Sequence, residues 1–77
     1  MVIDGTRYAP ESVTVKRGDT VTWMNRDPFP HTVTFGKTFD SRDIAANRSW
    51  KQVFREPGRF DYICTLHPGM KGTLIVE

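Results

Sequence analysis

Hydrophobic and polar residues alternate in four segments of this chain. In each segment, every second residue is a valine, an aromatic residue or the cysteine, and the residues between them are mostly polar. A period of two is typical of half-buried β-strands, and β-branched and aromatic residues favour that conformation. A fifth strand is predicted at residues 72–77, where Leu74 and Val76 share one face. The four alternating sets are Val13 and Val15, Val21 and Trp23, Val33 and Phe35, and Phe60, Tyr62 and Cys64.

Short turns and loops separate the predicted strands. Residues 17–19 contain Gly18 and are compact enough for a tight turn, and residues 56–58 form a turn that contains proline and glycine. Residues 25–30 form a loop that two prolines stiffen. Only residues 41–47 suggest a helix, of about one turn.

These elements predict an all-β fold in a single domain that spans residues 1–77. About six or seven short strands with frequent turns indicate a sandwich or a small barrel. A parallel α/β architecture is excluded, because the crossover helices that it requires are missing.

The composition fits one small domain and excludes several classes of protein. A 77-residue chain has a limited core, but 38% hydrophobic and 26% charged residues argue against disorder. The net charge of +2 is too small for a nucleic-acid-binding arm or a polybasic membrane anchor. No apolar run approaches the ~20 residues of a membrane-spanning helix. The first residues also lack the pattern of a signal peptide.

The single cysteine, Cys64, narrows the chemistry of the chain. One thiol forms neither an internal disulfide nor a zinc site that needs two or more cysteines. Cys64, His67 and Met70 follow one another at intervals of three residues, so a thiol, an imidazole and a thioether can turn inward from one short loop. The second histidine, His31, follows the proline-stiffened loop. If the strands pair antiparallel in a sandwich, loops cluster at one end, and His31 would face the other three side chains.

These four residues are suited to copper. Thiolate and thioether sulfur select copper, two imidazoles complete a trigonal plane, and a long axial methionine bond is typical of electron-transfer sites. Zinc would require a stronger fourth ligand, and iron–sulfur clusters require more cysteines. Taken singly, each residue has an ordinary structural explanation, but their joint spacing favours a metal site. We therefore predict one copper ion per chain, with His31, Cys64, His67 and Met70 as ligands.

The sequence resembles the cupredoxins, the type 1 blue-copper family, and most closely its amicyanin-like members, with plastocyanin-like and pseudoazurin-like proteins as relatives. This resemblance implies a Greek-key β-sandwich and single-electron transfer by cycling between Cu(II) and Cu(I), without enzymatic activity and hence without catalytic residues. It also implies a periplasmic or extracellular location, and the four predicted ligands fall on the ligand positions of the family. The matching segments are residues 18–26, Pro30-His31 and residues 58–70, within a resemblance from about Tyr8 to Glu77.

Two features depart from the pattern of the family. The chain lacks most of the extra strand with which amicyanin-like proteins begin, and its segment 35–50 is short, so one sheet edge is expected to be less covered. Thr32 follows His31 at a position where relatives often have an asparagine that ties the two ligand loops together. We expect Thr32 and Thr65 to supply a similar tie, which matters because hydrogen bonds near the cysteine sulfur tune the redox potential.

A redox partner is expected to dock transiently at a partly exposed His67, and the protein is expected to be a monomer that neither binds nucleic acid nor spans a membrane. A basic rim around the site would steer an acidic partner in a salt-dependent way. The apolar residues expected around His67 are Phe29, Leu66, Pro68 and Gly69, and the basic rim consists of Lys71, Arg26 and Arg7.

Three other functions compete with electron transfer. A copper carrier or storage protein would use the same ligands. An enzyme with a Cys–His nucleophile would use Cys64 and His67, although no orienting Asn or Asp is evident beside them. A single-stranded nucleic-acid binder would need aromatic residues on an exposed sheet face. The aromatic residues here mostly occupy the alternate strand positions that are predicted to point inward.

Overall fold

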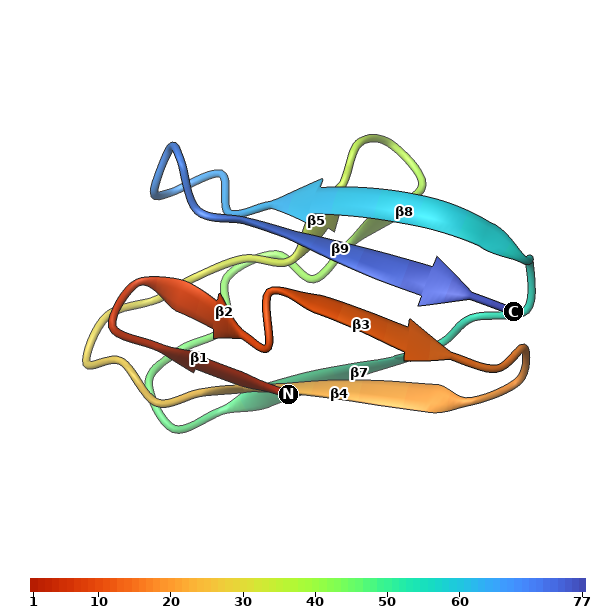
Figure 1. Ribbon diagram of the computed structural model, residues 1–77. Helices are drawn as coiled ribbons and strands as arrows, with labels where there is room; N and C mark the ends of the chain where they lie inside the picture. The colour runs from red at the N-terminus through yellow and green to blue at the C-terminus, as the bar shows by residue number, and fades with distance from the viewer.

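Nine short strands and no helix make up the computed structural model, which describes residues 1–77. They form a four-stranded sheet in the order β2-β1-β4-β7 and a five-stranded sheet in the order β3-β9-β8-β5-β6. The two sheets face each other as a sandwich (Figure 1), which confirms the predicted all-β class. The strands are β1 (Val2–Asp4), β2 (Arg7–Ala9), β3 (Ser12–Val15), β4 (Thr20–Asn25), β5 (Thr34–Phe35), β6 (Phe39–Asp40), β7 (Ser49–Val53), β8 (Gly58–Ile63) and β9 (Lys71–Val76).

Strand pairing is partly parallel, which the assumption of antiparallel pairing did not include. Strand β1 pairs parallel with β4, and β3 pairs parallel with β9, whereas β8 pairs antiparallel with both β9 and β5. The parallel pairs join strands that are distant in sequence, because the chain passes from one sheet to the other between β2 and β3. The loops that carry the predicted ligands still meet at one end of the sandwich, at the left of Figure 1.

The expected number of strands was too low, and the expected helix at residues 41–47 was wrong. Strands β1, β2, β6 and β7 were missed, and three of them have only two or three residues, too few to show an alternating pattern. Residues 41–47 contain no helix. Ile44 instead forms an antiparallel bridge with His31 and is 4% exposed. Because a single helical turn is costly to nucleate, burial of the Ile44 side chain determines the local structure.

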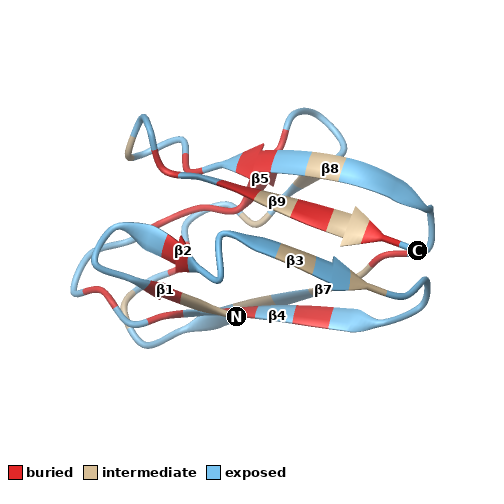
Figure 2. Cartoon of the chain, in the orientation of Figure 1, coloured by how far each residue is buried: buried red, intermediate tan, exposed pale blue.

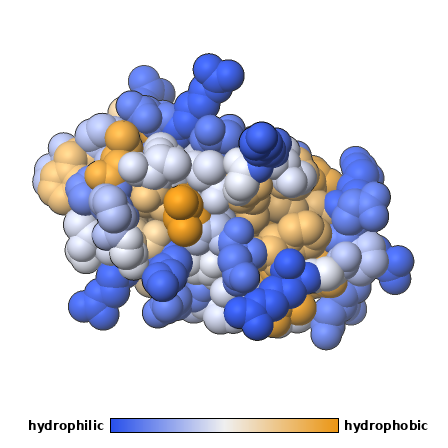
Figure 3. All heavy atoms as spheres, turned by 90° about the horizontal axis from the view of Figure 1, so that it is seen from above, coloured by the Kyte–Doolittle hydropathy of each residue, from blue (hydrophilic) through white to orange (hydrophobic).

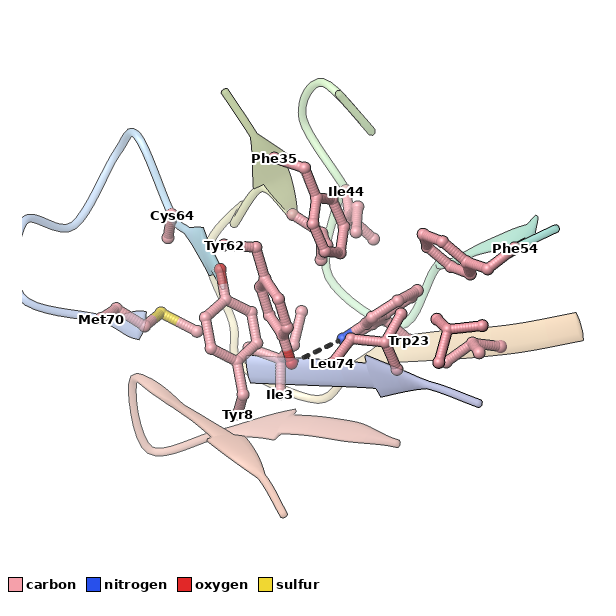
Figure 4. Packing of buried hydrophobic residues seen from close by; sticks show 13 residues of the cluster. Ile3, Tyr8, Trp23, Phe35, Ile44, Phe54, Tyr62, Cys64, Met70 and Leu74 are labelled. Atoms are coloured by element: carbon pink, nitrogen blue, oxygen red, sulfur yellow. Dashed lines mark hydrogen bonds between the residues drawn. The ribbon is translucent and has the colours of Figure 1, made fainter. Parts of the chain in front are cut away.

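The core lies between the sheets, where the inward residues of the alternating strands meet (Figure 2). Trp23 is fully buried, and its ring centroid lies 5.6 Å from that of Tyr62 and 6.1 Å from that of Phe54. The indole Nε1 of Trp23 donates a hydrogen bond of 3.2 Å to the hydroxyl of Tyr62 (Figure 4), and burial raises the pKa of Tyr62 to about 12. The alternate positions of β4 face solvent, and Met24 is exposed among them.

Gly72 gives the core one close backbone approach. It is the cross-strand partner of Tyr62, and a Cβ atom at position 72 would lie 2.5 Å from Cζ and 2.6 Å from Oη of that ring. The ring has little freedom to move, because it packs against Tyr8 and Phe35 and its hydroxyl is bonded to Trp23.

Gly72→Ala is therefore expected to lower the free energy of unfolding by about 1–3 kcal/mol, the usual cost of overpacking a core. Urea unfolding followed by tryptophan fluorescence measures this change. Lys71→Ala, at the exposed neighbouring position of β9, is the control and should stay within about 0.5 kcal/mol of the native protein. Equal unfolding midpoints for Gly72→Ala and the native protein would show that the Tyr62 ring is free to move.

Candidate metal centre

Three of the four predicted ligand side chains converge at one end of the sandwich. The metal-binding atoms of His31, Cys64 and His67 all lie within 4.8 Å of one another. The Sγ atom of Cys64 is 3.6 Å from Nδ1 of His31 and 3.9 Å from Nδ1 of His67. Both imidazoles thus present Nδ1 to the thiol, and one metal ion could bond to all three donor atoms.

Backbone hydrogen bonds hold each of these residues. His31 precedes β5, and its N–H and C=O are both bonded to Ile44 across the isolated bridge. In the loop between β8 and β9, the N–H of Cys64 donates to the carbonyl of Met70, and the N–H of Met70 donates to the carbonyl of His67. These bonds fold residues 64–70, which we call the ligand loop, back on itself.

Met70, the fourth predicted ligand, is buried at the base of the ligand loop. Its side chain is 5% exposed and belongs to the hydrophobic core. Figure 4 shows Cys64 and Met70 at the same end of the core, beside Tyr8. The backbone bond from Cys64 to Met70 keeps these two residues adjacent.

His67 is the only predicted ligand that reaches the surface. Its side chain is half-buried, whereas those of His31 and Cys64 are at most 1% exposed. The ring of Phe29 lies 5.2 Å from that of His67, and both Phe29 and Leu66 are exposed. Hydrophobic residues also appear at this end of the molecule, at the left of Figure 3. The exposed rim therefore has the apolar character that the sequence predicted.

Thr32 ties the two segments of the site together. Its N–H donates to Sγ of Cys64 at 3.3 Å, and its Oγ1 accepts a hydrogen bond of 2.9 Å from the N–H of Thr65. This is the tie that we expected from Thr32 and Thr65. Thr32 and Thr34 are both buried, because the hydroxyl-bearing side of residues 32–35 is covered as well as the valine side, so these threonines do not lie on a solvent face.

Asp27 is the functional residue that the sequence analysis missed. It is 5% exposed, and its Oδ2 lies 2.6 Å from Nε2 of His31, which is the nitrogen that faces away from Cys64. Burial alone would raise the pKa of Asp27, but hydrogen bonds from the backbone of Thr6 and Gly5 and from His31 outweigh it and hold the pKa below its usual range. No motif marks this contact, because Gly5 and Thr6 are more than 20 residues away from Asp27.

Two further buried polar residues shape the site. Asn25 donates hydrogen bonds from Nδ2 to the carbonyls of Phe29 and Ile44, and its Oδ1 accepts the N–H of Asp27. The hydroxyl of Tyr8 donates a hydrogen bond of 2.6 Å to the carbonyl of Thr32, and burial raises the pKa of Tyr8 far above its usual range. Together they fix the loop before His31 and the segment after it.

The burial of these side chains decides between the chemical interpretations. A nucleophilic cysteine needs access to a substrate, and Cys64 is 1% exposed. A stacking surface for bases needs exposed aromatic residues, and Phe29 is the only aromatic residue among the exposed large hydrophobic side chains. A set of one thiol and two imidazole nitrogens, of which only that of His67 belongs to a half-buried residue, instead suits a soft metal ion such as copper. The structure contains no helix that is long and apolar enough to span a membrane.

Comparison with known proteins agrees with this chemistry. The family model for a cupredoxin-like domain matches residues 1–76. Amicyanin of Paracoccus versutus is 37% identical over 81 residues, which cover 97% of this chain and 61% of that protein. Amicyanin-alpha of Methylorubrum extorquens is 36% identical over 77 residues, and the match covers 92% of this chain and 65% of that protein. Plastocyanin of Scenedesmus fuscus is 34% identical over 84 residues, with 91% and 86% covered. The chain therefore spans less than two thirds of the length of these two amicyanins.

Solved structures of amicyanin variants have the same fold. One variant in its oxidized state matches with a TM-score of 0.94 and 35% identity, covering 99% of this chain and 78% of that one. A second variant in a Cu(I) form gives the same four values. The match confirms the predicted cupredoxin-like sandwich, and part of the amicyanin chain has no counterpart here.

Proposed function

Because this chain belongs to the cupredoxin-like family, we propose that it is a type 1 copper protein that carries single electrons between redox partners. The observation that carries the proposal is the convergence of Nδ1 of His31, Sγ of Cys64 and Nδ1 of His67 in a buried site. In this proposal the whole chain, residues 1–77, is one copper-binding domain with one copper ion.

Each residue has a distinct role in the proposed site. His31, Cys64 and His67 would supply the three strong bonds, and Met70 a weak axial one. Bound copper would supply a one-electron couple between Cu(II) and Cu(I). The N–H of Thr32 would stabilise the negative charge of the Cys64 thiolate. Backbone bonds at Ile44 and within the ligand loop would keep the donor atoms in place, so that the site changes little when an electron enters or leaves.

We place the docking site for the redox partner around His67. This residue joins the buried site to the surface, and the exposed side chains of Phe29 and Leu66 lie in the same region. Arg26, Lys71 and Arg7 are exposed and would favour an acidic partner, with binding that weakens as salt increases. A monomer in the periplasm or outside the cell is the setting that we propose for this role.

A copper carrier would use the same soft donors, and electrochemistry distinguishes the two functions. For an electron carrier, we expect voltammetry of the copper-loaded protein to give a reversible one-electron couple with fast self-exchange. A carrier would instead cycle poorly and release Cu(I) to a competing chelator. Slow, irreversible voltammetry together with rapid copper release would overturn electron transfer in favour of copper trafficking.

Met70→Leu tests the proposed axial ligand. Leucine has nearly the same volume, so the fold should be kept at a cost below about 1.5 kcal/mol. We expect the reduction potential to rise, because the thioether donates more to Cu(II) than to Cu(I), and the visible spectrum to shift. Met24→Leu, an exposed methionine of β4, is the control and should change neither. If Met70→Leu also left both unchanged, Met70 would not be a ligand.

A further inference from the structure

A buried carboxylate, that of Asp27, links the N-terminal hairpin to the metal centre. We propose that Asp27 positions His31 for the metal ion, and that the turn of the β1–β2 hairpin holds Asp27 in place. This inference rests on the proposed copper function. The hairpin, residues 2–9, contributes no ligand, but in this proposal it helps to hold a ligand in position.

The contact between Asp27 and His31 determines which nitrogen of His31 is available. The Oδ2 atom of Asp27 lies 2.6 Å from Nε2, and both side chains are buried. Because a carboxylate only accepts, the hydrogen of the neutral ring must lie on Nε2. Nδ1 then keeps its lone pair, and it is the atom 3.6 Å from Sγ of Cys64. Histidine ligands commonly donate their other ring N–H to a carboxylate, which orients the ring and increases its basicity.

The hairpin turn holds the carboxylate by both oxygens. The N–H of Gly5 donates to Oδ1 at 2.8 Å, and the N–H of Thr6 donates to Oδ2 at 2.9 Å. Gly5 and Thr6 have φ values of 61° and 57°, and this left-handed turn directs two consecutive N–H groups at one acceptor. The N–H of Asp27 itself donates to Asn25, so both ends of the residue are anchored.

The charge of Asp27 also bears on the metal. A carboxylate in a buried site is screened weakly, so its attraction for a cation is stronger than at the surface. The extra positive charge of Cu(II) makes that attraction larger than for Cu(I). Asp27 should therefore strengthen binding of Cu(II) more than binding of Cu(I). If Asp27 only served to close the hairpin, removing its charge would weaken the binding of Cu(II) and of Cu(I) to the same extent.

The first experiment measures the ring of His31 in the metal-free protein. Nitrogen-15 NMR, at a pH well above the ordinary histidine pKa of about 6.5, reports which ring nitrogen carries the hydrogen. We expect the native protein to hold it on Nε2 and Asp27→Asn to show a mixture of the two tautomers. Asparagine keeps the shape of the side chain, but its amide N–H₂ would face a backbone donor of the turn. The native Nε2–H form in Asp27→Asn would overturn the positioning role.

The second experiment compares copper affinities. For Asp27→Asn we expect a loss of about 10–100-fold in Cu(II) affinity, the usual effect of removing such a partner, with a smaller loss for Cu(I). The reduction potential should then rise. Glu56→Gln, in the turn between β7 and β8 at the far end of the sandwich, removes the same charge and should leave both affinities at the native values. Equal losses for Cu(II) and Cu(I) in Asp27→Asn would overturn the effect of the charge.

A third variant tests the hairpin. Proline at position 6 lacks the N–H that bonds to Asp27, and its ring excludes a φ of 57°. Thr6→Pro should therefore weaken Cu(II) binding, and the double variant with Asp27→Asn should lose little more than Asp27→Asn alone. Additive losses would show that the hairpin acts independently of Asp27. If the native protein itself binds no copper, the proposed function fails, whereas the NMR measurement still tests the link from Asp27 to His31.

Discussion

Cys64→Ala is expected to abolish the intense visible absorption of the copper-loaded protein. That absorption would arise from charge transfer between the thiolate and Cu(II), and Cys64 is the only cysteine of the chain. Alanine removes this donor, but His31 and His67 remain. The variant is therefore expected to bind copper weakly and to lack the intense band. The comparison uses visible spectra of native and variant protein at equal copper loading.

The fold of the variant must be intact for this result to count. The Sγ atom of Cys64 accepts the N–H of Thr32, but the N–H of Cys64 bonds to Met70 through the backbone and remains in the variant. Circular dichroism of metal-free native and variant protein should therefore agree. Thr73→Ala, which removes a half-buried side chain of β9 that bonds to Asp61, is a control that should keep the native band. A band of native intensity in folded Cys64→Ala would exclude Cys64 as the copper ligand.

Trp23→Ala is expected to cost the largest share of stability of any single substitution. The side chain is fully buried, its ring lies against Phe35, Phe54 and Tyr62, and its Nε1 is bonded to Tyr62. Large-to-small changes at such sites cost about 3–5 kcal/mol. A domain of this size has a total stability of roughly 4–12 kcal/mol, at about 0.05–0.15 kcal/mol per residue. The variant should therefore be marginally folded or unfolded.

Urea unfolding of metal-free protein, followed by circular dichroism, measures this loss. Trp50→Ala is the matched control, because Trp50 is the cross-strand partner of Trp23 but is only half-buried. The control should lose clearly less stability. If both variants unfolded at the same urea concentration, the core would not be centred on Trp23.

The alternating pattern predicted the strands that are long enough to show it. Strands β4 and β8 have six residues each, and their buried positions, such as Trp23 and Tyr62, are those of the predicted parity. Strands β1 and β2 have three residues each and depend on pairing with each other and with β4. Such pairing is a tertiary interaction, and no local sequence period encodes it.

The candidate site divides in the same way. Cys64, His67 and Met70 could be proposed as ligands because their residue types and spacing are local, and His31 because it is the only other histidine. Asp27 was not recognisable, because its importance comes from contacts with Gly5 and Thr6 that only the folded hairpin creates. The supposed helix at residues 41–47 failed for the same reason, since the bridge between Ile44 and His31 is also a tertiary contact.

The central claim is that His31, Cys64 and His67 form a type 1 copper site, and titration of the metal-free protein with Cu(II) tests it most directly. Visible absorption and electron paramagnetic resonance are recorded as copper is added. We predict saturation at one copper ion per chain, with an intense thiolate-to-copper band and narrow copper hyperfine splitting. A protein that stays colourless, while its Cys64 thiol remains free to react with an alkylating reagent, would contradict the claim.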